Sequence, residues 1–190
     1  MIADLFNISN LLAAIAVARL EGISLEEMKS SIESFSGIDG RMERVVMDHK
    51  VIVVDFAHTP DALENALKTL AEIKSNRLIT VFGCGGDRDS SKRPVMGKIA
   101  EKYSDKVIVT SDNPRTEDPV SIIKDITAGM AIEVDAISDR RAAIYSAIHD
   151  AKAGDIILIA GKGHEKTQII GTEEFLFDDM EVAKSYFNNK

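Results

Sequence analysis

The chain has 190 residues, of which 45% are hydrophobic, so it can form one good core, or one domain and a piece of another. Its formal net charge of -8, without a long Lys/Arg run, argues against a nucleic-acid partner. No apolar run approaches the roughly 18 residues that would span a bilayer. The first residues lack the basic segment with which a signal peptide begins, so no signal peptide is expected. The single cysteine excludes an internal disulfide. We therefore predict a cytoplasmic protein that binds neither nucleic acid nor membrane.

The beginning of the chain predicts two helices that follow no strand of their own. Ser9–Leu20 has an apolar face at helical spacing, and Gly22 stops it. A second helix begins at Ser24, where Glu27 three residues later completes a capping box.

Turn-rich residues 36–40 follow these helices and are typical of a linker. We assign residues 1–37 to the end of a truncated preceding domain and residues 38–190 to the main domain.

From residue 51 onward, short apolar segments alternate with amphipathic helical segments. The predicted strands are 51–55, 78–82, 106–110, 132–137 and 155–160, and the predicted helices are 60–74, 93–102, 119–130 and 140–152. A hairpin is expected around Gly171, and a last helix runs from Asp178 or Asp179 to Phe187. Alternation of this kind is typical of a doubly wound sheet. We predict an α/β, Rossmann-like fold with a mostly parallel sheet of about six strands flanked by helices.

The segments that follow the predicted strands hold most of the chemically versatile residues. In an open α/β sheet, ligands bind beyond the carboxyl ends of the strands. Four such ends lead into polar, glycine-rich or charged segments, which are residues 55–61, 83–89, 111–119 and 161–166. The Walker pattern and the Rossmann Gly-x-Gly-x-x-Gly pattern are both absent, so this chain alone is not expected to hold the phosphates of a nucleotide.

Fixed charges of both signs follow neighbouring strands. Arg88 and Arg115 carry guanidinium groups, which suit bidentate recognition of a carboxylate, and Glu165 could pair with an ammonium group. Together these three residues would recognise a zwitterionic amino acid. Each residue taken singly is more readily explained by a surface ion pair.

Other residues at the strand ends also have ordinary explanations when taken singly. Residues 112–114, Asp-Asn-Pro, could be only a turn, and Asp55 could cap the next turn. His58 could be a packed or surface histidine, and Cys84 is best explained as a small buried residue. No Cys/His spacing suggests zinc, and no motif supports a nucleophilic triad.

Taken together, five segments resemble the Mur ligase family, of the type that adds meso-diaminopimelate to a peptidoglycan precursor. The segments are Gly40-Arg41-Met42-Glu43, Asp55 to Leu63, Gly83 to Asp89 followed by Lys92-Arg93-Pro94, Asp112 to Pro119, and Gly161 to Glu165. They occur in the order and at the spacings of that family. Residues 6–14 resemble the end of the family's central ATPase domain, so the resemblance extends from near Phe6 to the last helix.

The resemblance implies roles for particular positions. Those that match residues holding meso-diaminopimelate are Arg88, Asp112, Asn113, Pro114, Arg115, Gly161 and Glu165. Those that match contacts with ATP are Arg41, Asp55 and His58. Lysine-adding relatives resemble Asp-Asn-Pro-Ala at the Asp-Asn-Pro-Arg motif. Arg115 therefore favours diaminopimelate, whose second carboxylate it could pair with, and disfavours the ammonium group of lysine.

The resemblance also implies the reaction. ATP would phosphorylate the D-glutamyl carboxylate of UDP-N-acetylmuramoyl-L-alanyl-D-glutamate, and the amine of the amino acid would attack the acyl phosphate. The P-loop and the Mg2+ ligands of the family belong to domains that this sequence does not contain, so we expect a C-terminal part that is inactive alone and holds no catalytic or metal-ligating residue. Two alternatives are a free-standing amino-acid-binding module and a folylpolyglutamate synthase, and Arg115 and residues 161–165 argue against the second.

Overall fold

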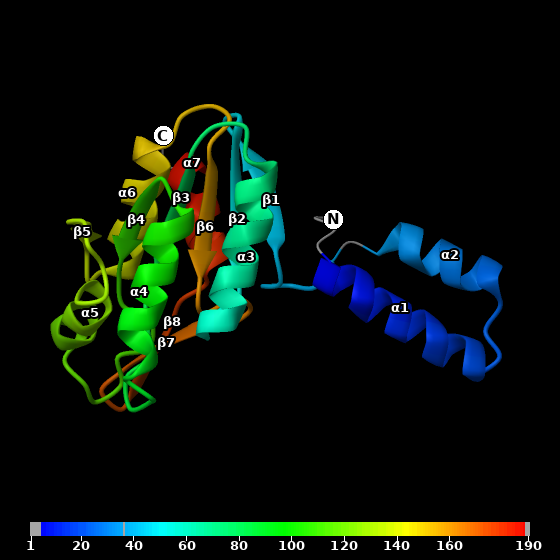
Figure 1. Cartoon of the computed structure of the whole chain (residues 1–190), viewed down its shortest axis with the longest axis horizontal. Coiled ribbons are helices and arrows are strands. Elements are labelled where there is room, and N and C mark those ends of the chain that lie inside the picture. The colour runs from blue at the N-terminus through cyan, green and yellow to red at the C-terminus, as the bar shows by residue number, and fades with distance from the viewer. Residues whose placement is uncertain (1–4, 36, 189–190) are drawn as a thin grey trace. The chain divides into compact units, whose positions relative to one another are not determined.

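A computed structural model describes residues 5–35 and 37–188. The chain divides into two compact units, Met1–Ile38 and Asp39–Lys190, which are drawn together in Figure 1. Residue 36 of the predicted linker lies outside the described residues.

The smaller unit contains two helices, α1 (Leu5–Leu20) and α2 (Leu25–Ser34). Helix α1 begins at Leu5, so the predicted start at Ser9 is wrong. Ser9 is exposed on this helix, where a polar side chain is tolerated because it can be hydrated. The predicted capping box of α2 is present, because Ser24 Oγ accepts from the Glu27 N–H at 3.2 Å and Glu27 Oε2 accepts from the Ser24 N–H at 3.1 Å.

The larger unit is built on a six-stranded sheet with the order β1-β2-β6-β3-β4-β5. Its strands are β1 (Glu43–Met47), β2 (Lys50–Asp55), β3 (Leu78–Phe82), β4 (Lys106–Val109), β5 (Asp135–Ala136) and β6 (Ile156–Ala160). Strand β1 is antiparallel to β2, and the other neighbours are parallel. The predicted α/β fold with a mostly parallel sheet is therefore confirmed.

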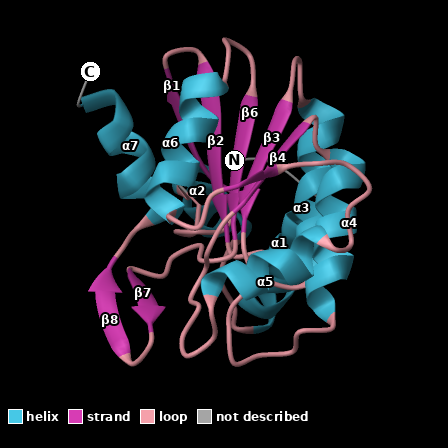
Figure 2. Cartoon of the chain, turned by 90° about the vertical axis from the view of Figure 1, so that its left-hand side faces the viewer, coloured by secondary structure: helices cyan, strands magenta, loops and turns pink. Residues whose placement is uncertain are grey.

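Helices cover both faces of this sheet, as Figure 2 shows. They are α3 (Pro60–Ile73), α4 (Lys92–Tyr103), α5 (Pro119–Thr127), α6 (Arg140–Asp150) and α7 (Asp179–Asn188). Helices α3, α4 and α5 lie on one face, while α6 and α7 lie on the other. The predicted hairpin around Gly171 is also present and consists of β7 (Thr167–Ile170) and β8 (Glu173–Leu176).

Strand β1 is not among the predicted strands, because it lacks a strong apolar pattern. Its residues alternate between half-buried and exposed positions, as in a strand at the edge of a sheet. The turn that joins it to β2 contains Asp48 and His49 with φ values of 51° and 59°. Two-residue hairpin turns of this left-handed type usually contain glycine, so the usual turn signal is missing.

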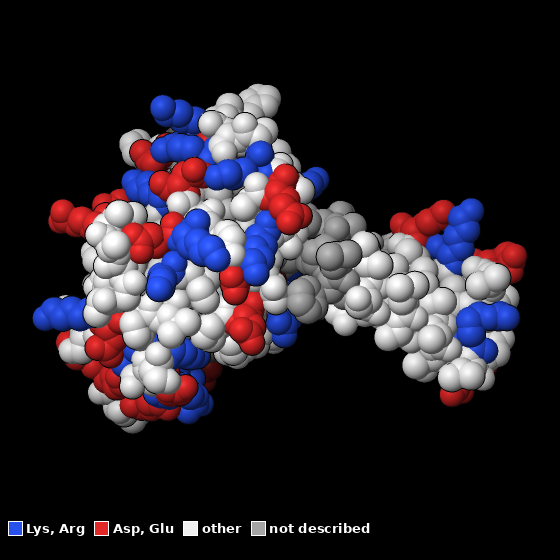
Figure 3. Space-filling model, in the orientation of Figure 1, with Lys and Arg blue, Asp and Glu red and all other residues white. Residues whose placement is uncertain are grey.

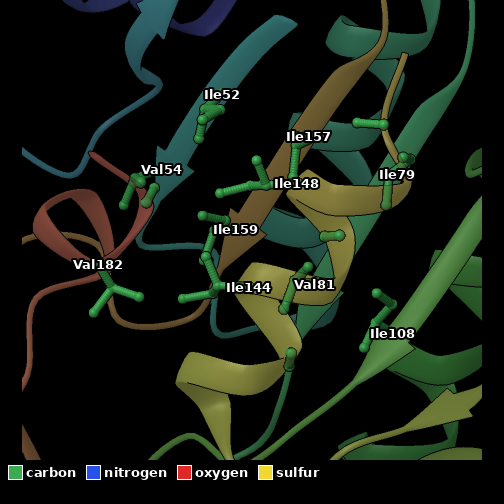
Figure 4. Close-up of a cluster of buried hydrophobic side chains, with 14 of the residues drawn as sticks. Ile52, Val54, Ile79, Val81, Ile108, Ile144, Ile148, Ile157, Ile159 and Val182 are labelled. Carbon is green, nitrogen blue, oxygen red and sulfur yellow. The ribbon is translucent and has the colours of Figure 1, made fainter. Parts of the chain in front are cut away.

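Aliphatic side chains fill the space between the sheet and helix α6. Ile144 and Ile148 of α6 lie against Ile157 and Ile159 of β6, and Val182 of α7 joins the same cluster (Figure 4). These five side chains are at most 3% exposed. Burying such side chains contributes roughly 1.5–3 kcal/mol each, which makes this cluster a main source of the unit's stability.

The parallel strands end at one level because of their register. Asp55 of β2 and Phe82 of β3 both pair with Ala160 of β6, and Phe82 also pairs with Val109 of β4. The loops that follow these four residues therefore emerge side by side along one edge of the sheet.

At the amino ends of the parallel strands, Asp155 is a buried carboxylate directly before β6. Its side chain is fully buried and accepts from the Lys152 N–H at 2.8 Å and the Arg77 N–H at 3.1 Å. The Arg77 guanidinium adds two donors at 3.1 and 2.8 Å. Burial alone would raise the pKa of Asp155, but these donors outweigh it and hold the pKa below its ordinary value.

We expect Asp155→Asn to lower the free energy of unfolding at pH 7 by roughly 1–3 kcal/mol, because a hydrogen-bonded charge is lost. Because the pKa of Asp155 is lower in the folded than in the unfolded protein, its contribution to stability is fully present above the unfolded pKa of about 4. The contribution is lost as the pH falls through the lower pKa of the folded protein. Urea titrations from pH 7 to pH 2 should therefore show the two proteins converging in acid. Glu133→Gln, at an exposed position, serves as the control. A stability difference between the two proteins that stays constant down to pH 2 would contradict the lowered pKa of Asp155 in the folded protein.

The surface of the larger unit carries charges of both signs. On the face drawn in Figure 3, Lys and Arg side chains are interspersed with Asp and Glu side chains and form no continuous basic area. Among the described residues, none of the helices combines the length and apolarity that crossing a membrane requires.

Candidate functional site

Four loops meet at the carboxyl edge of the sheet, beside the β7–β8 hairpin (Figure 2). They are residues 56–59, 83–91, 110–118 and 161–166. Glycines let them approach closely, since a Cβ on Gly86 would lie 1.9 Å from the Pro114 carbonyl oxygen. A Cβ on Gly161 would lie 2.6 Å from Asp112 Oδ2. The 83–91 and 161–166 loops are thus both packed against the Asp-Asn-Pro-Arg segment.

Asn113 is the centre of the hydrogen bonds between these loops. Its side chain is 4% exposed, and Oδ1 accepts from Lys162 Nζ and from the Ile169 N–H, both at 3.0 Å. Its Nδ2 donates to Glu165 Oε2 at 2.9 Å. One amide therefore joins the loop after β4 to the loop after β6 and to strand β7.

Glu165 lies at the mouth of this arrangement, with its side chain 36% exposed. Burial by itself would raise the pKa of Glu165, but hydrogen bonds from Lys162 and Asn113 outweigh it. The charge of Arg115 adds to this effect, so the pKa lies below its ordinary value. Glu165 is therefore an anion at neutral pH, and it can attract an ammonium group.

Arg115 is held through its main chain by the β7–β8 hairpin. Its N–H donates to the Ile169 carbonyl at 3.1 Å, and its carbonyl accepts from the Gly171 N–H at 2.7 Å. The φ of Arg115 is 51°, in the left-handed region that residues other than glycine rarely adopt. The two hydrogen bonds to the hairpin offset the energetic cost of this backbone conformation. The guanidinium Nη1 donates to the Gly86 carbonyl at 2.8 Å, which directs the side chain toward the loop after β3.

Arg88 lies on that same loop and is exposed. Its Nη1 donates to the Asp87 carbonyl at 3.1 Å. A Cβ on Gly85 would lie 3.0 Å from Arg115 Nη1 and 3.9 Å from Arg88 Cγ, so both arginines flank this glycine. Asp87 in turn accepts from the Thr116 hydroxyl at 2.8 Å, which ties the loop to the segment after Arg115. The structure thus places two cations on neighbouring loops.

Asp112 lies beneath these groups. It is 8% exposed, and its Oδ1 accepts from the Asn113 N–H at 2.7 Å. Burial raises the pKa of Asp112, while the charges of Arg140 and Lys162 oppose the rise.

A second group of candidate residues surrounds the ring of Phe56. Arg41 Cζ lies 4.7 Å from the ring centroid, within cation–π distance. The imidazole rings of His58 and His164 lie 4.5 and 5.2 Å from the same centroid. His58 Nδ1 is also 2.9 Å from the Phe56 carbonyl oxygen. Arg41 and both histidines are exposed, so this group forms a cationic and aromatic surface.

Asp55 supports this second group from below. It is buried at the end of β2, and its Oδ2 accepts from the Met42 N–H at 2.8 Å. Gly163 approaches so closely that a Cβ there would lie 2.6 Å from Phe56 Cβ. The loop after β6 therefore touches both groups, with Gly161 beside Asp112 and Gly163 beside Phe56.

The structure brings the predicted site residues into two adjoining groups. One contains Arg88, Asp112, Asn113, Pro114, Arg115, Gly161 and Glu165, and the other contains Arg41, Asp55 and His58. Three side chains that belong to these groups were not among the predicted site residues: Phe56, Lys162 and His164. All three lie within the motifs that carry the family resemblance, and a lysine between two glycines was the one available signal for Lys162.

Cys84 takes no part in either group. It is 2% exposed, with its Sγ 3.7 Å from Met96 Sδ, and burial raises the pKa of the thiol to about 12. It therefore stays a neutral packed thiol, as predicted. Within residues 5–35 and 37–188, no three His, Cys, Asp or Glu side chains gather in a way that could hold a metal ion.

The fold and the site define a class of protein. A doubly wound sheet with charged, glycine-rich loops along its carboxyl edge has the architecture in which open α/β domains bind ligands. The chain belongs to the Mur ligase family, because residues 40–163 match the family model described as "Mur ligase, glutamate ligase domain".

Individual relatives share high identity with this chain. It is 53% identical over 189 residues to a protein of Prochlorococcus marinus and 50% identical over 186 residues to one of Alkaliphilus oremlandii. Both are named UDP-N-acetylmuramoyl-L-alanyl-D-glutamate--2,6-diaminopimelate ligase. The matches cover 97% and 96% of this chain, which spans only 38% of the length of each relative.

Solved structures agree with this assignment. A structure of a ligase with the same name is 44% identical, with a TM-score of 0.76, and the match covers 97% of this chain and 39% of that one. A folylpolyglutamate synthase of Thermotoga maritima is 21% identical with a TM-score of 0.64, covering 83% of this chain and 36% of that one. At that identity the second match shows a shared fold only.

Proposed function

We propose that this chain is the amino-acid-selecting part of a cytoplasmic, ATP-dependent ligase. The ligase joins meso-diaminopimelate to UDP-N-acetylmuramoyl-L-alanyl-D-glutamate in peptidoglycan synthesis. The observation that carries the proposal is the arrangement around Asn113, which places the anion Glu165 and the cation Arg115 on adjoining loops. An amino acid has one group for each of these charges, and diaminopimelate has a second pair at its far end.

In this proposal the guanidinium groups of Arg115 and Arg88 pair with a carboxylate of diaminopimelate. Glu165 pairs with an ammonium group, and Asp112, Asn113, Pro114 and Gly161 shape the loop that holds both. An Arg–carboxylate pair is often bidentate, which fixes orientation as well as charge. Orientation matters because the reacting amine must approach an acyl phosphate along one direction.

The surface around Phe56 is the proposed contact with ATP. Arg41 can approach phosphate oxygens, while His58 lies beside the ring at the same exposed surface. Asp55 holds the main chain of the segment that carries Arg41, through the Met42 N–H. The remainder of the ligase would supply the phosphate cradle and the Mg2+ ions that stabilise the transferring phosphoryl group.

The test is an amino-acid comparison with the complete protein that contains this chain. With ATP, Mg2+ and the UDP-linked dipeptide present, we expect kcat/KM for meso-diaminopimelate to exceed that for L-lysine by roughly 100-fold or more. A site built to pair with the second carboxylate rejects an analogue that lacks it. Release of phosphate and formation of the tripeptide are the measurements.

Two other outcomes would overturn the proposal. Binding of diaminopimelate without any product would favour an amino-acid-binding module that lacks catalysis. Ligation of L-lysine at a similar rate would remove the proposed selectivity and leave only a ligase of the same family.

A further inference from the structure

We propose that Lys162 is a positioning residue for recognition of the ammonium group of the amino acid. It holds Glu165 and Asn113 in place from inside the protein and does not touch the ligand. The inference rests on the proposed function and adds a residue to the predicted site.

Lys162 is completely buried although it carries a charge. It is the second residue after the end of β6 and lies between Gly161 and Gly163, whose φ values are 118° and 53°. Such values favour glycine, so the backbone at this point suits a tight turn that places the lysine inside the protein. Its Nζ donates to Asn113 Oδ1 and to Glu165 Oε2, both at 3.0 Å.

The two oxygens of Glu165 have different environments. Oε2 accepts from Lys162 Nζ at 3.0 Å and from Asn113 Nδ2 at 2.9 Å. Within the part of the chain that the structure describes, no hydrogen-bond donor is assigned to Oε1. One oxygen is therefore anchored to the protein, while the other remains for a ligand on a side chain that is 36% exposed.

A lysine is a costly residue for this position if it only fills space. Taking an ammonium group out of water is unfavourable, and an apolar side chain of similar volume often replaces a buried ion pair without loss of stability. The charge is explained if it orients Glu165. Lys166 offers a contrast on the same loop, because it is 61% exposed and pairs with Asp178 outside the site.

The first measurement uses Lys162→Met in the complete ligase. We expect KM for meso-diaminopimelate to rise about tenfold, because a Glu165 side chain that has lost one of its two donors must be ordered when the ligand binds. KM for ATP should change by less than about twofold, since the contacts around Phe56 are unaffected. Lys166→Met is the matched control and should leave both constants unchanged. An equal rise in both KM values would overturn the proposal.

A double-mutant cycle separates positioning from general structural damage. If Lys162 acts through Glu165, Lys162→Met should raise KM by less than about threefold in a Glu165→Gln background. A tenfold rise that persists in this background would mean that Lys162 acts by another route. If the methionine variant does not fold in thermal melts, the same cycle is run with Lys162→Gln, which removes the charge and shortens the side chain, and the same tenfold and threefold changes are expected.

The wild-type assay distinguishes this inference from the proposed function. A wild-type ligase that does not use diaminopimelate at all would overturn the proposed function. An active wild-type enzyme whose Lys162→Met variant keeps its KM would overturn only the role of Lys162.

Discussion

Replacing Arg115 with alanine is expected to raise KM for meso-diaminopimelate by roughly 30- to 1,000-fold in the complete ligase. Truncating one member of a desolvated charge pair costs roughly 2–4 kcal/mol, much of it from the partner charge left unpaired. The partner here would be a carboxylate of the ligand. KM for ATP should stay within about twofold, because Arg115 belongs to the group around Asn113 rather than to the group around Phe56.

The structure makes this substitution a clean test. The main chain of Arg115 is held by hydrogen bonds to Ile169 and Gly171, which alanine retains. Arginine and alanine both carry a Cβ, so the left-handed φ of 51° at position 115 is unfavourable for both. The backbone cost therefore largely cancels when the variant is compared with the wild type. The observed change should therefore report the lost guanidinium.

Selectivity should change together with affinity. Without the cation of Arg115, the ammonium group of L-lysine is no longer repelled, so the preference for diaminopimelate over lysine should fall. Arg44→Ala is the matched control, because Arg44 is an exposed arginine on the edge strand β1. Parallel increases in KM for ATP and for diaminopimelate would remove Arg115 from the selective role.

Replacing Arg140 with methionine is expected to lower the free energy of unfolding of this chain by about 3–5 kcal/mol. Arg140 forms a bidentate pair with Asp179, with Nε to Oδ1 at 2.8 Å and Nη2 to Oδ2 at 2.7 Å. Both side chains are 0% exposed. Removing the guanidinium leaves a buried carboxylate without its counter-ion.

The same guanidinium also bonds to the loop after β4 and to the last residue of β6. Its Nη1 donates to the Ser111 carbonyl at 3.2 Å, and Nη2 donates to the Ala160 carbonyl at 3.1 Å. These residues directly precede Asp112 and Gly161, so Arg140 joins the ends of β4 and β6 beneath the site. Its loss should therefore also loosen the loops that carry Asn113 and Glu165.

Urea unfolding followed by circular dichroism measures the first effect. Lys184→Met removes an exposed pair with Glu181 and should cost less than about 1 kcal/mol. The double variant Arg140→Met with Asp179→Leu should recover part of the lost stability, since it no longer buries a lone charge. A loss below about 1 kcal/mol for Arg140→Met would mean that Asp179 is stabilised by other groups.

The local pattern of the sequence was sufficient to predict most of the helices and strands. Leu78–Phe82 is a run of apolar and β-branched residues, and the strand has the predicted bounds. Pro60 and Pro119 begin their helices at the predicted residues, because proline suits the first turn. The exceptions are elements with weak local signals, such as the edge strand β1, and the start of α1.

The candidate site was predictable to the extent that it follows strand ends. The carboxyl ends of parallel strands meet at one edge, so Asp55, Asn113, Arg115 and Glu165 were expected together before any order of strands was known. The motifs that contain these residues also carried the family resemblance. What the residues bind remains a proposal.

Only the tertiary structure decided which of these residues touch. Strand β6 inserts between β2 and β3, although it follows them late in the chain. That order brings Lys162 to Asn113 across a sequence separation of 49 residues. Periodicity reports the faces of single elements and contains no information on strand order. The burial of Lys162, and with it the anchoring of Glu165, is therefore a property of the assembled sheet.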